Sequence, residues 1–107
     1  MVEQALQDLR QSKMETEGVF IDAQKNYYDA AVAKKSHIEL NGLAEAALLA
    51  ARPYRAALDA LLAFLTGSPL YNGNDEMART ESFIHALGGE ESGLSKMAAI
   101  HLNESKK

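Results

Sequence analysis

Apolar residues in the first third of the chain recur at a spacing that alternates between three and four positions. The row consists of Val2, Leu6, Leu9, Lys13, Thr16, Phe20, Ala23, Tyr27, Ala30 and Lys34. This spacing predicts one long helix that packs along a single seam. Glycine in a helix interior costs about 1 kcal/mol relative to alanine, so we expect a kink or a break near Gly18.

The next segment carries the pattern of a chain reversal. Ser36 and Glu39 have the spacing of a capping box, while Asn41 and Gly42 are typical of a turn or a helix C-cap. A second long helix is predicted from residue 43 to residue 65, so residues 1–67 form a long helical hairpin. Pro53 interrupts this helix and predicts a kink there, or an end near residue 51 followed by a restart.

The second helix carries two apolar rows rather than one. The first row is Leu40, Ala44, Ala47, Ala51, Leu58, Leu61 and Leu65, and the second is Leu43, Ala47, Ala50, Tyr54, Ala57, Leu61 and Phe64. One neighbouring helix covers only one row, so the pattern predicts two packing partners. We expect oligomerisation to complete the bundle, with a shared core of Leu43, Ala47, Tyr54, Leu58, Leu61, Phe64 and Leu65.

Residues 68–74 read as a linker, because Ser-Pro and Asn-Gly are strong turn pairs. Asn74 or Asp75 is placed to cap a third helix. Gly88 and Gly89 are predicted to end that helix, so residues 75–107 would form a pair of shorter helices.

Composition agrees with an all-α fold in a single domain of 107 residues. Alanine and leucine far outnumber the β-branched residues that favour strands. The net charge of −4 disfavours nucleic acid as a partner, since such proteins gain affinity from lysine and arginine at phosphates. The first residues lack the basic and apolar regions of a secretory signal, and we expect a cytoplasmic protein.

Arg52, Arg55 and one acidic residue lie near the middle of the apolar second helix, and their charges argue against a membrane span. The two guanidinium groups are one turn apart and could grip a carboxylate or a phosphate. The simpler interpretation is an ion pair between Arg55 and Asp59, four residues on, with Arg52 in solvent or paired with the first helix.

Tyr27 and Tyr28 are adjacent on the first helix, so at most one of the two rings can face inward. Tyr28 is therefore a candidate contact residue. Glu90 and Glu91, in the predicted acidic turn, complete the candidate partner-binding set.

The sequence offers no catalytic residues, cofactor site or metal site. No nucleophile elbow, phosphate-binding loop or dinucleotide fingerprint is present, and the chain has no cysteine. Two acid–histidine pairs, Glu81 with His85 and His101 with Glu104, have helical spacing but lack the Glu-x-x-His motif of di-iron bundles. We therefore interpret these histidines as helix-surface or helix-end residues.

These observations favour a non-enzymatic protein–protein interaction module that acts as a homodimer or higher oligomer. Small acidic helical proteins of this kind serve as adaptors, assembly factors or inhibitors of larger machines, and a phage origin fits that class. The alternative is a DNA-binding transcriptional regulator, because the predicted C-terminal helix pair has the outline of a helix-turn-helix.

Overall fold

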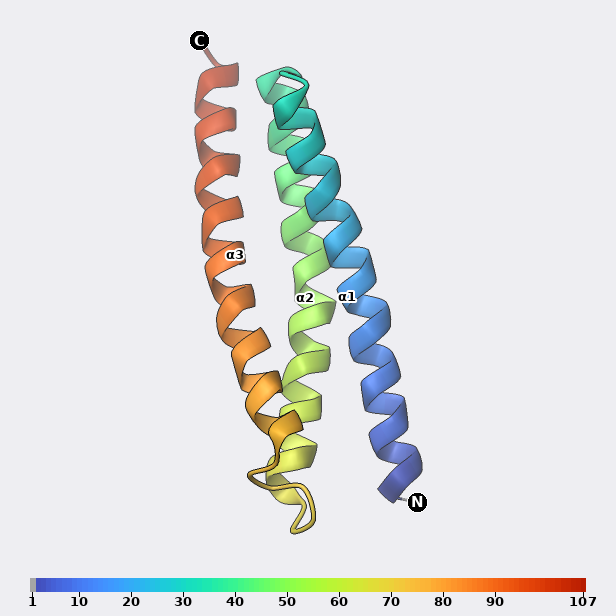
Figure 1. Cartoon of the computed structure of the whole chain (residues 1–107). Coiled ribbons are helices and arrows are strands. Elements are labelled where there is room, and N and C mark those ends of the chain that lie inside the picture. The colour runs from blue at the N-terminus through green and yellow to red at the C-terminus, as the bar shows by residue number, and fades with distance from the viewer. Residues whose placement is uncertain (1) are drawn as a thin grey trace.

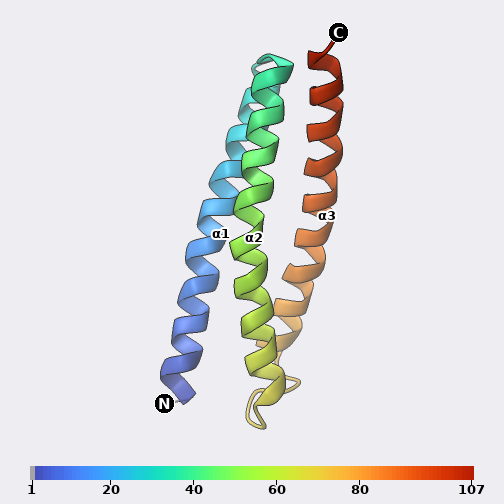
Figure 2. The ribbon, with the colours of Figure 1, turned by 180° about the vertical axis from the view of Figure 1, so that it is seen from behind.

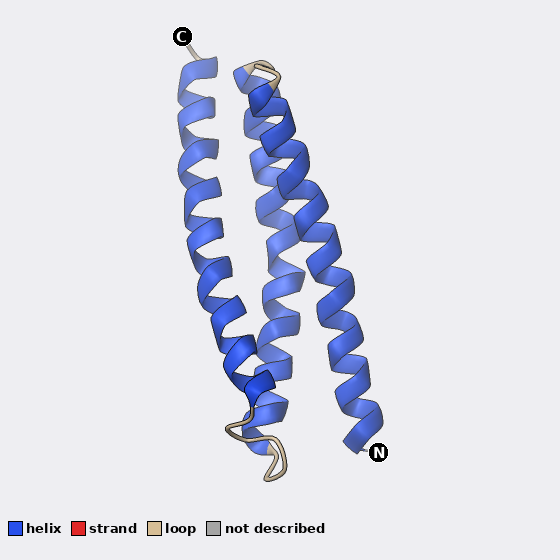
Figure 3. Ribbon diagram, viewed as in Figure 1, coloured by secondary structure: helices blue, strands red, loops and turns tan. Residues whose placement is uncertain are grey.

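The computed structural model describes residues 2–107, which form three helices of equal length (Figures 1 and 3). They are α1 (Val2–Val32), α2 (His37–Gly67) and α3 (Asp75–Ser105). The helices run up, down and up, and the rod they form measures 56 × 19 × 18 Å. The view from behind shows α2 between the two outer helices (Figure 2). The all-α bundle and the long hairpin predicted from the sequence are confirmed.

α1 is continuous through Gly18, so the break expected there does not occur. Its buried residues are Leu6, Phe20 and Tyr27, and partly buried Lys13 lies between the first two. These four positions are seven residues apart and belong to the predicted seam. Burial of this seam against α2 stabilises the helix by more than one glycine costs.

The chain reverses at residues 33–36, five residues before the predicted turn at Asn41 and Gly42. Lys34 has φ 57°, and Ser36 then caps α2, its side chain accepting a hydrogen bond from the backbone N of Glu39 at 3.2 Å. The predicted cap at Ser36 is therefore confirmed, while Asn41 and Gly42 lie inside the first turns of α2. Asn41 packs inward, where its Nδ2 donates to the carbonyl oxygen of Ala98 at 2.8 Å.

α2 also runs through Pro53, without the end and restart considered from the sequence. Pro53 is exposed. A carbonyl that loses its helical partner on this outer side can be hydrated, and the core face of α2 is not interrupted. The helix ends at Gly67, and the loop over residues 68–74 matches the predicted linker.

The predicted C-terminal helix pair is wrong, because α3 is a single helix that continues through Gly88 and Gly89. Asn74 caps it as expected, accepting a hydrogen bond from the backbone N of Met77 at 2.9 Å. Thr80, Leu87, Leu94 and His101 are buried at seven-residue intervals along α3. This seam packs on α2 on both sides of the glycines, and the packing keeps the helix intact across them.

The two apolar rows of α2 do have two packing partners, as predicted, but both partners belong to the same chain. α1 and α3 each pack on α2. Five residues of the predicted shared core are buried inside the single chain and two are half-buried: Ala47, Tyr54, Leu58, Leu61 and Leu65, then Leu43 and Phe64. These positions do not require a second chain to cover them.

No helix within residues 2–107 combines the length and apolarity needed to cross a membrane.

Candidate functional site: a groove between the outer helices

The outer helices α1 and α3 are separated from each other on one face of the rod. The exposed side of α2 lies on the opposite face. Among residues 2–107, no Cα atom of α1 lies within 8 Å of a Cα atom of α3. In Figure 1 this face points toward the viewer, and α2 lies behind the two outer helices. Only side chains bridge α1 and α3, and they do so above a floor formed by α2.

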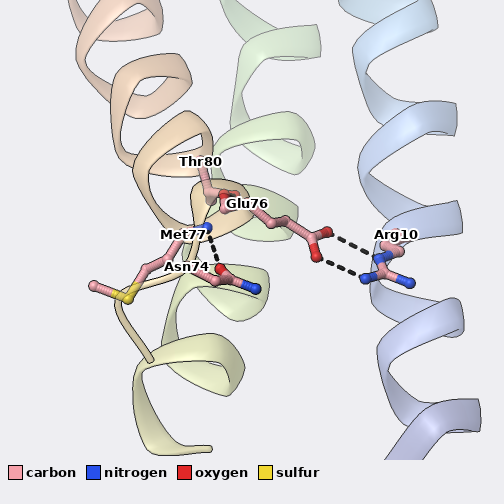
Figure 4. Close-up of polar contacts among 5 residues, drawn as sticks. All are labelled: Arg10, Asn74, Glu76, Met77 and Thr80. Atoms are coloured by element: carbon pink, nitrogen blue, oxygen red, sulfur yellow. Dashed lines mark hydrogen bonds and ion pairs between the residues drawn. The ribbon is translucent and has the colours of Figure 1, made fainter. Parts of the chain in front are cut away.

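The strongest bridge is the ion pair between Arg10 on α1 and Glu76 on α3. The Arg10 Nε and Nη2 atoms donate to the two carboxylate oxygens of Glu76 at 2.9 and 2.6 Å (Figure 4). These hydrogen bonds lower the pKa of the Glu76 carboxyl. Glu76 also lies in the first turn of α3, where the helix dipole favours a negative charge. The bridge fixes the start of α3 against α1.

Two hollows lie between α1 and α3, and they share Phe83 as a common wall. The basic hollow, of about 190 Å³, is lined by Arg10, Lys13, Met14, Leu61, Glu76, Arg79, Thr80 and Phe83. The acidic hollow, of about 180 Å³, is lined by Glu17, Phe20, Ile21, Gln24, Tyr54, Phe83, Ala86, Leu87 and Glu90. We refer to the two hollows together as the groove. Each is smaller than the 300 Å³ or so at which small-molecule pockets begin, so the groove better suits side chains of another polypeptide.

The acidic hollow contains a stacked pair of rings and a hydrogen bond between two of its lining residues. The rings of Phe20 and Tyr54 stack with centroids 5.9 Å apart, and the Tyr54 hydroxyl donates to Glu17 Oε2 at 2.9 Å. Burial, followed by this hydrogen bond to a carboxylate, raises the pKa of Tyr54 well above its usual value. Tyr54 therefore acts as a neutral hydrogen-bond donor.

The rims of the groove carry exposed apolar side chains at seven-residue spacing. On α1 they are Met14, Ile21 and Tyr28, with exposed fractions of 63%, 50% and 52%. On α3, Phe83 and Met97 are 38% and 37% exposed, and Glu90 lies midway between them. Lys13 Nζ covers part of the Phe83 ring at 4.5 Å from its centroid. Residues seven positions apart stay on the same side of a helix that winds around its neighbours. These rows could therefore contact one further helix along its length.

The structure separates the five predicted partner-binding residues. Tyr28 and Glu90 lie on the groove side, where Tyr28 continues the apolar row of α1 and Glu90 lines the acidic hollow. Arg55 and Glu91 pair with each other across α2 and α3, and Arg55 Nε donates to Glu91 Oε1 at 3.0 Å. The predicted Arg55–Asp59 pair is thus replaced by a pair between helices. Arg52 is exposed on α2.

A polar cluster that the sequence did not indicate joins all three helices at the other end of the rod. His101 is 6% exposed; its Nε2 lies 2.9 Å from the Tyr27 hydroxyl and its Nδ1 lies 3.0 Å from Nδ1 of His37. Burial, followed by repulsion from His37, lowers the pKa of His101. The contacting residues are 74 and 64 positions apart in sequence, so helical spacing could not reveal them.

Neither acid–histidine pair considered from the sequence belongs to a larger ligand set. Among residues 2–107 no group of three or more histidine, cysteine, aspartate or glutamate side chains is arranged to hold a metal ion. His85 is exposed on α3, and His101 faces Tyr27 and His37. Every buried side-chain nitrogen or oxygen within these residues has a hydrogen-bond partner.

Comparison with known proteins identifies no relative: no family model, curated protein or solved structure matches the chain.

Proposed function

We propose that the protein is a non-enzymatic interaction module that binds another polypeptide chain in the groove between α1 and α3. The observation that carries this proposal is the pair of exposed apolar rows on the rims. Met14, Ile21 and Phe83 leave between 38% and 63% of their surface exposed beside a floor of buried residues. Apolar side chains gathered around a groove are typical of a site where an amphipathic helix packs.

The polar groups of the groove favour a structural role over a chemical one. Glu76 is held by Arg10, and Glu17 accepts from Tyr54, so two carboxylates are engaged by partners within the chain. Paired groups of this kind fix the shape of a surface and set the charges that it presents to a partner. Such a surface suits an adaptor, an assembly factor or an inhibitor of a larger protein machine.

The alternative of DNA binding is not carried forward. It depended on a turn at Gly88 and Gly89 between two short helices, and both glycines lie inside α3. Without that turn there is no separate recognition helix to enter a major groove.

The proposal is tested with a photo-crosslinking amino acid at one position of the groove and one position outside it. Ile21→benzoylphenylalanine places the probe on the rim, and Leu49→benzoylphenylalanine places it at a 59% exposed apolar position of α2 outside both hollows. Both variants are irradiated in cells that naturally express the protein, and the adducts are identified by mass spectrometry.

We expect the Ile21 probe to form a discrete adduct with a polypeptide, either a second copy or another protein, and the Leu49 probe to form none. Equal adducts at both positions, or no polypeptide adduct at Ile21, would overturn the proposal. Circular dichroism of the two purified variants confirms that each is folded before the comparison is made.

A further inference from the structure

The two halves of the groove carry opposite charge. The basic hollow contains three cationic side chains, Arg10, Lys13 and Arg79, and one carboxylate, Glu76. The acidic hollow contains two carboxylates, Glu17 and Glu90, and no cationic side chain. Arg79 and Glu90 are both exposed on α3, at opposite ends of the groove. Arg10 is paired with Glu76, and Lys13 Nζ lies 3.9 Å from Glu17 Oε2, so the charges that polarise the groove along the rod are those of Arg79 in the basic hollow and Glu90 in the acidic hollow.

A groove polarised in this way is complementary to its own copy in one orientation. If two copies face each other with their helices parallel, each hollow meets the same hollow of the other copy, and like charges oppose. If one copy is reversed about a two-fold axis perpendicular to the rod, the basic hollow of each meets the acidic hollow of the other. Charge complementarity of this kind fixes register and suppresses other arrangements.

The apolar rim residues fit the same reversed arrangement. Met14 and Arg79 line the basic hollow, while Ile21 and Glu90 line the acidic hollow, so each hollow contributes one apolar rim residue of α1 and one charged residue of α3. Phe83 borders both hollows and so lies at the boundary between them. An axis through this level brings Met14 of one copy to Ile21 of the other, and Arg79 of one copy to Glu90 of the other.

We infer that a second copy of this chain occupies the groove, reversed about a two-fold axis near Phe83, with Arg79 of each copy paired with Glu90 of the other. This inference rests on the proposed function and names the partner of that site. α1 and α3 of both copies then form a central four-helix bundle, and the α2 helix of each copy lies on the outside of this bundle. The dimer buries the rims rather than the rows of α2 from which oligomerisation was predicted.

Charge exchange at the two exposed positions tests the inference. Arg79→Glu and Glu90→Arg each replace two attractive contacts in the dimer with two repulsive ones, while the double variant restores attraction with the signs exchanged. Sedimentation equilibrium and light scattering on a sizing column measure the mass of each protein against the 11.6 kDa of one chain.

We expect the unaltered protein to be a dimer at micromolar concentrations. Each single variant should weaken dimerisation by more than about tenfold, and the double variant should recover it. A monomeric unaltered protein, single variants that dimerise normally, or a folded double variant that stays monomeric would each overturn the inference. Both side chains are exposed, so we expect all variants to fold, and circular dichroism verifies this.

The reversed register has its own test, because the chain contains no cysteine. Met14→Cys and Ile21→Cys proteins are mixed and oxidised. The inference requires a disulfide between the two different variants and little cross-linking of either variant alone. Cross-linking of either variant alone, or no disulfide between the two variants in the mixture, would overturn it.

The inference and the proposed function fail in different ways. If the unaltered protein is monomeric but the Ile21 probe captures another polypeptide, the second copy is excluded and the groove remains a docking site. If the protein is monomeric and the probe captures no polypeptide, both proposals are overturned.

Discussion

His101 shows how a single residue can make the stability of the bundle depend on pH. Its imidazole is buried between the Tyr27 hydroxyl of α1 and the His37 ring of α2. Burial and the nearby histidine disfavour its charged form, so the pKa of His101 in the folded protein lies below the unfolded value of 6.5. The unfolded chain therefore binds more protons at mildly acid pH, and folding becomes less favourable as the pH falls.

We expect the melting temperature to decrease as the pH is lowered from about 7.5 to about 5.5, because His101 takes up a proton more readily in the unfolded chain than in the folded protein. The Glu76 carboxyl, whose pKa is lowered from 4.5, contributes to the pH dependence below this range. His101→Gln should reduce the slope measured by circular dichroism over this window. His85→Gln removes one exposed histidine outside the cluster and is the matched control; an equal change in slope for both variants would contradict the assignment.

Residue-scale contacts divide into those that the sequence predicts and those that it does not. The caps at Ser36 and Asn74 were predicted because a cap is a local interaction, with donor and acceptor three residues apart. The partners of Arg55 and His101 were not predicted, because they lie on other helices. Helical spacing pointed to Asp59 for Arg55, whereas packing of α3 on α2 brings Glu91 to it.

At the scale of the helix, α3 illustrates tertiary packing that overrides local preference. Gly88, Gly89 and Gly93 each disfavour a helix interior by about 1 kcal/mol relative to alanine, and this predicted a turn. Leu87 and Leu94 are 1% exposed on the two sides of these glycines, and their burial on α2 keeps the segment helical. The seam on α1 was predictable because no comparable pair of glycines interrupts its apolar spacing.

We expect Gly89→Ala and Gly93→Ala each to raise the free energy of unfolding by about 0.5 to 1 kcal/mol. Alanine lowers the conformational entropy of the unfolded chain. A Cβ atom at either position would meet no atom of a neighbouring helix within 4 Å, so no steric cost offsets this effect. Gly73→Ala is the control with the opposite expected sign. Gly73 has φ 81°, which alanine adopts only with strain, so this substitution should lower the free energy of unfolding. Chemical denaturation measures all three, and a loss of stability in Gly89→Ala would contradict a continuous α3.

For the whole molecule, the deciding feature is that α2 packs against both other helices of the same chain. The sequence predicted two partners for α2 correctly and assigned one of them to another chain. The error followed from the treatment of α3, because two short helices joined by a turn could not have covered the length of α2. Once α3 is one helix of the same length as α2, a single chain supplies both partners.

We expect Leu58→Ala to lower the free energy of unfolding by about 2 to 5 kcal/mol, the range for truncation of a fully buried leucine. Leu58 belongs to a cluster with residues of all three helices, so unfolding should remain one cooperative transition. Denaturation followed by far-UV circular dichroism and by tyrosine fluorescence measures both properties. Transitions at different denaturant concentrations for the two probes would contradict a shared core.

The absence of close backbone contact between α1 and α3, within residues 2–107, has a consequence for how fast the chain can fold. The two pairs of helices that pack closely, α1 with α2 and α2 with α3, are each joined by a short loop. Formation of their contacts therefore requires the closure of short loops only. Either hairpin can form first, because each needs α2 and neither needs the other. The chain thus has two alternative routes to the same topology, with the order of docking left to the relative stability of the two hairpins.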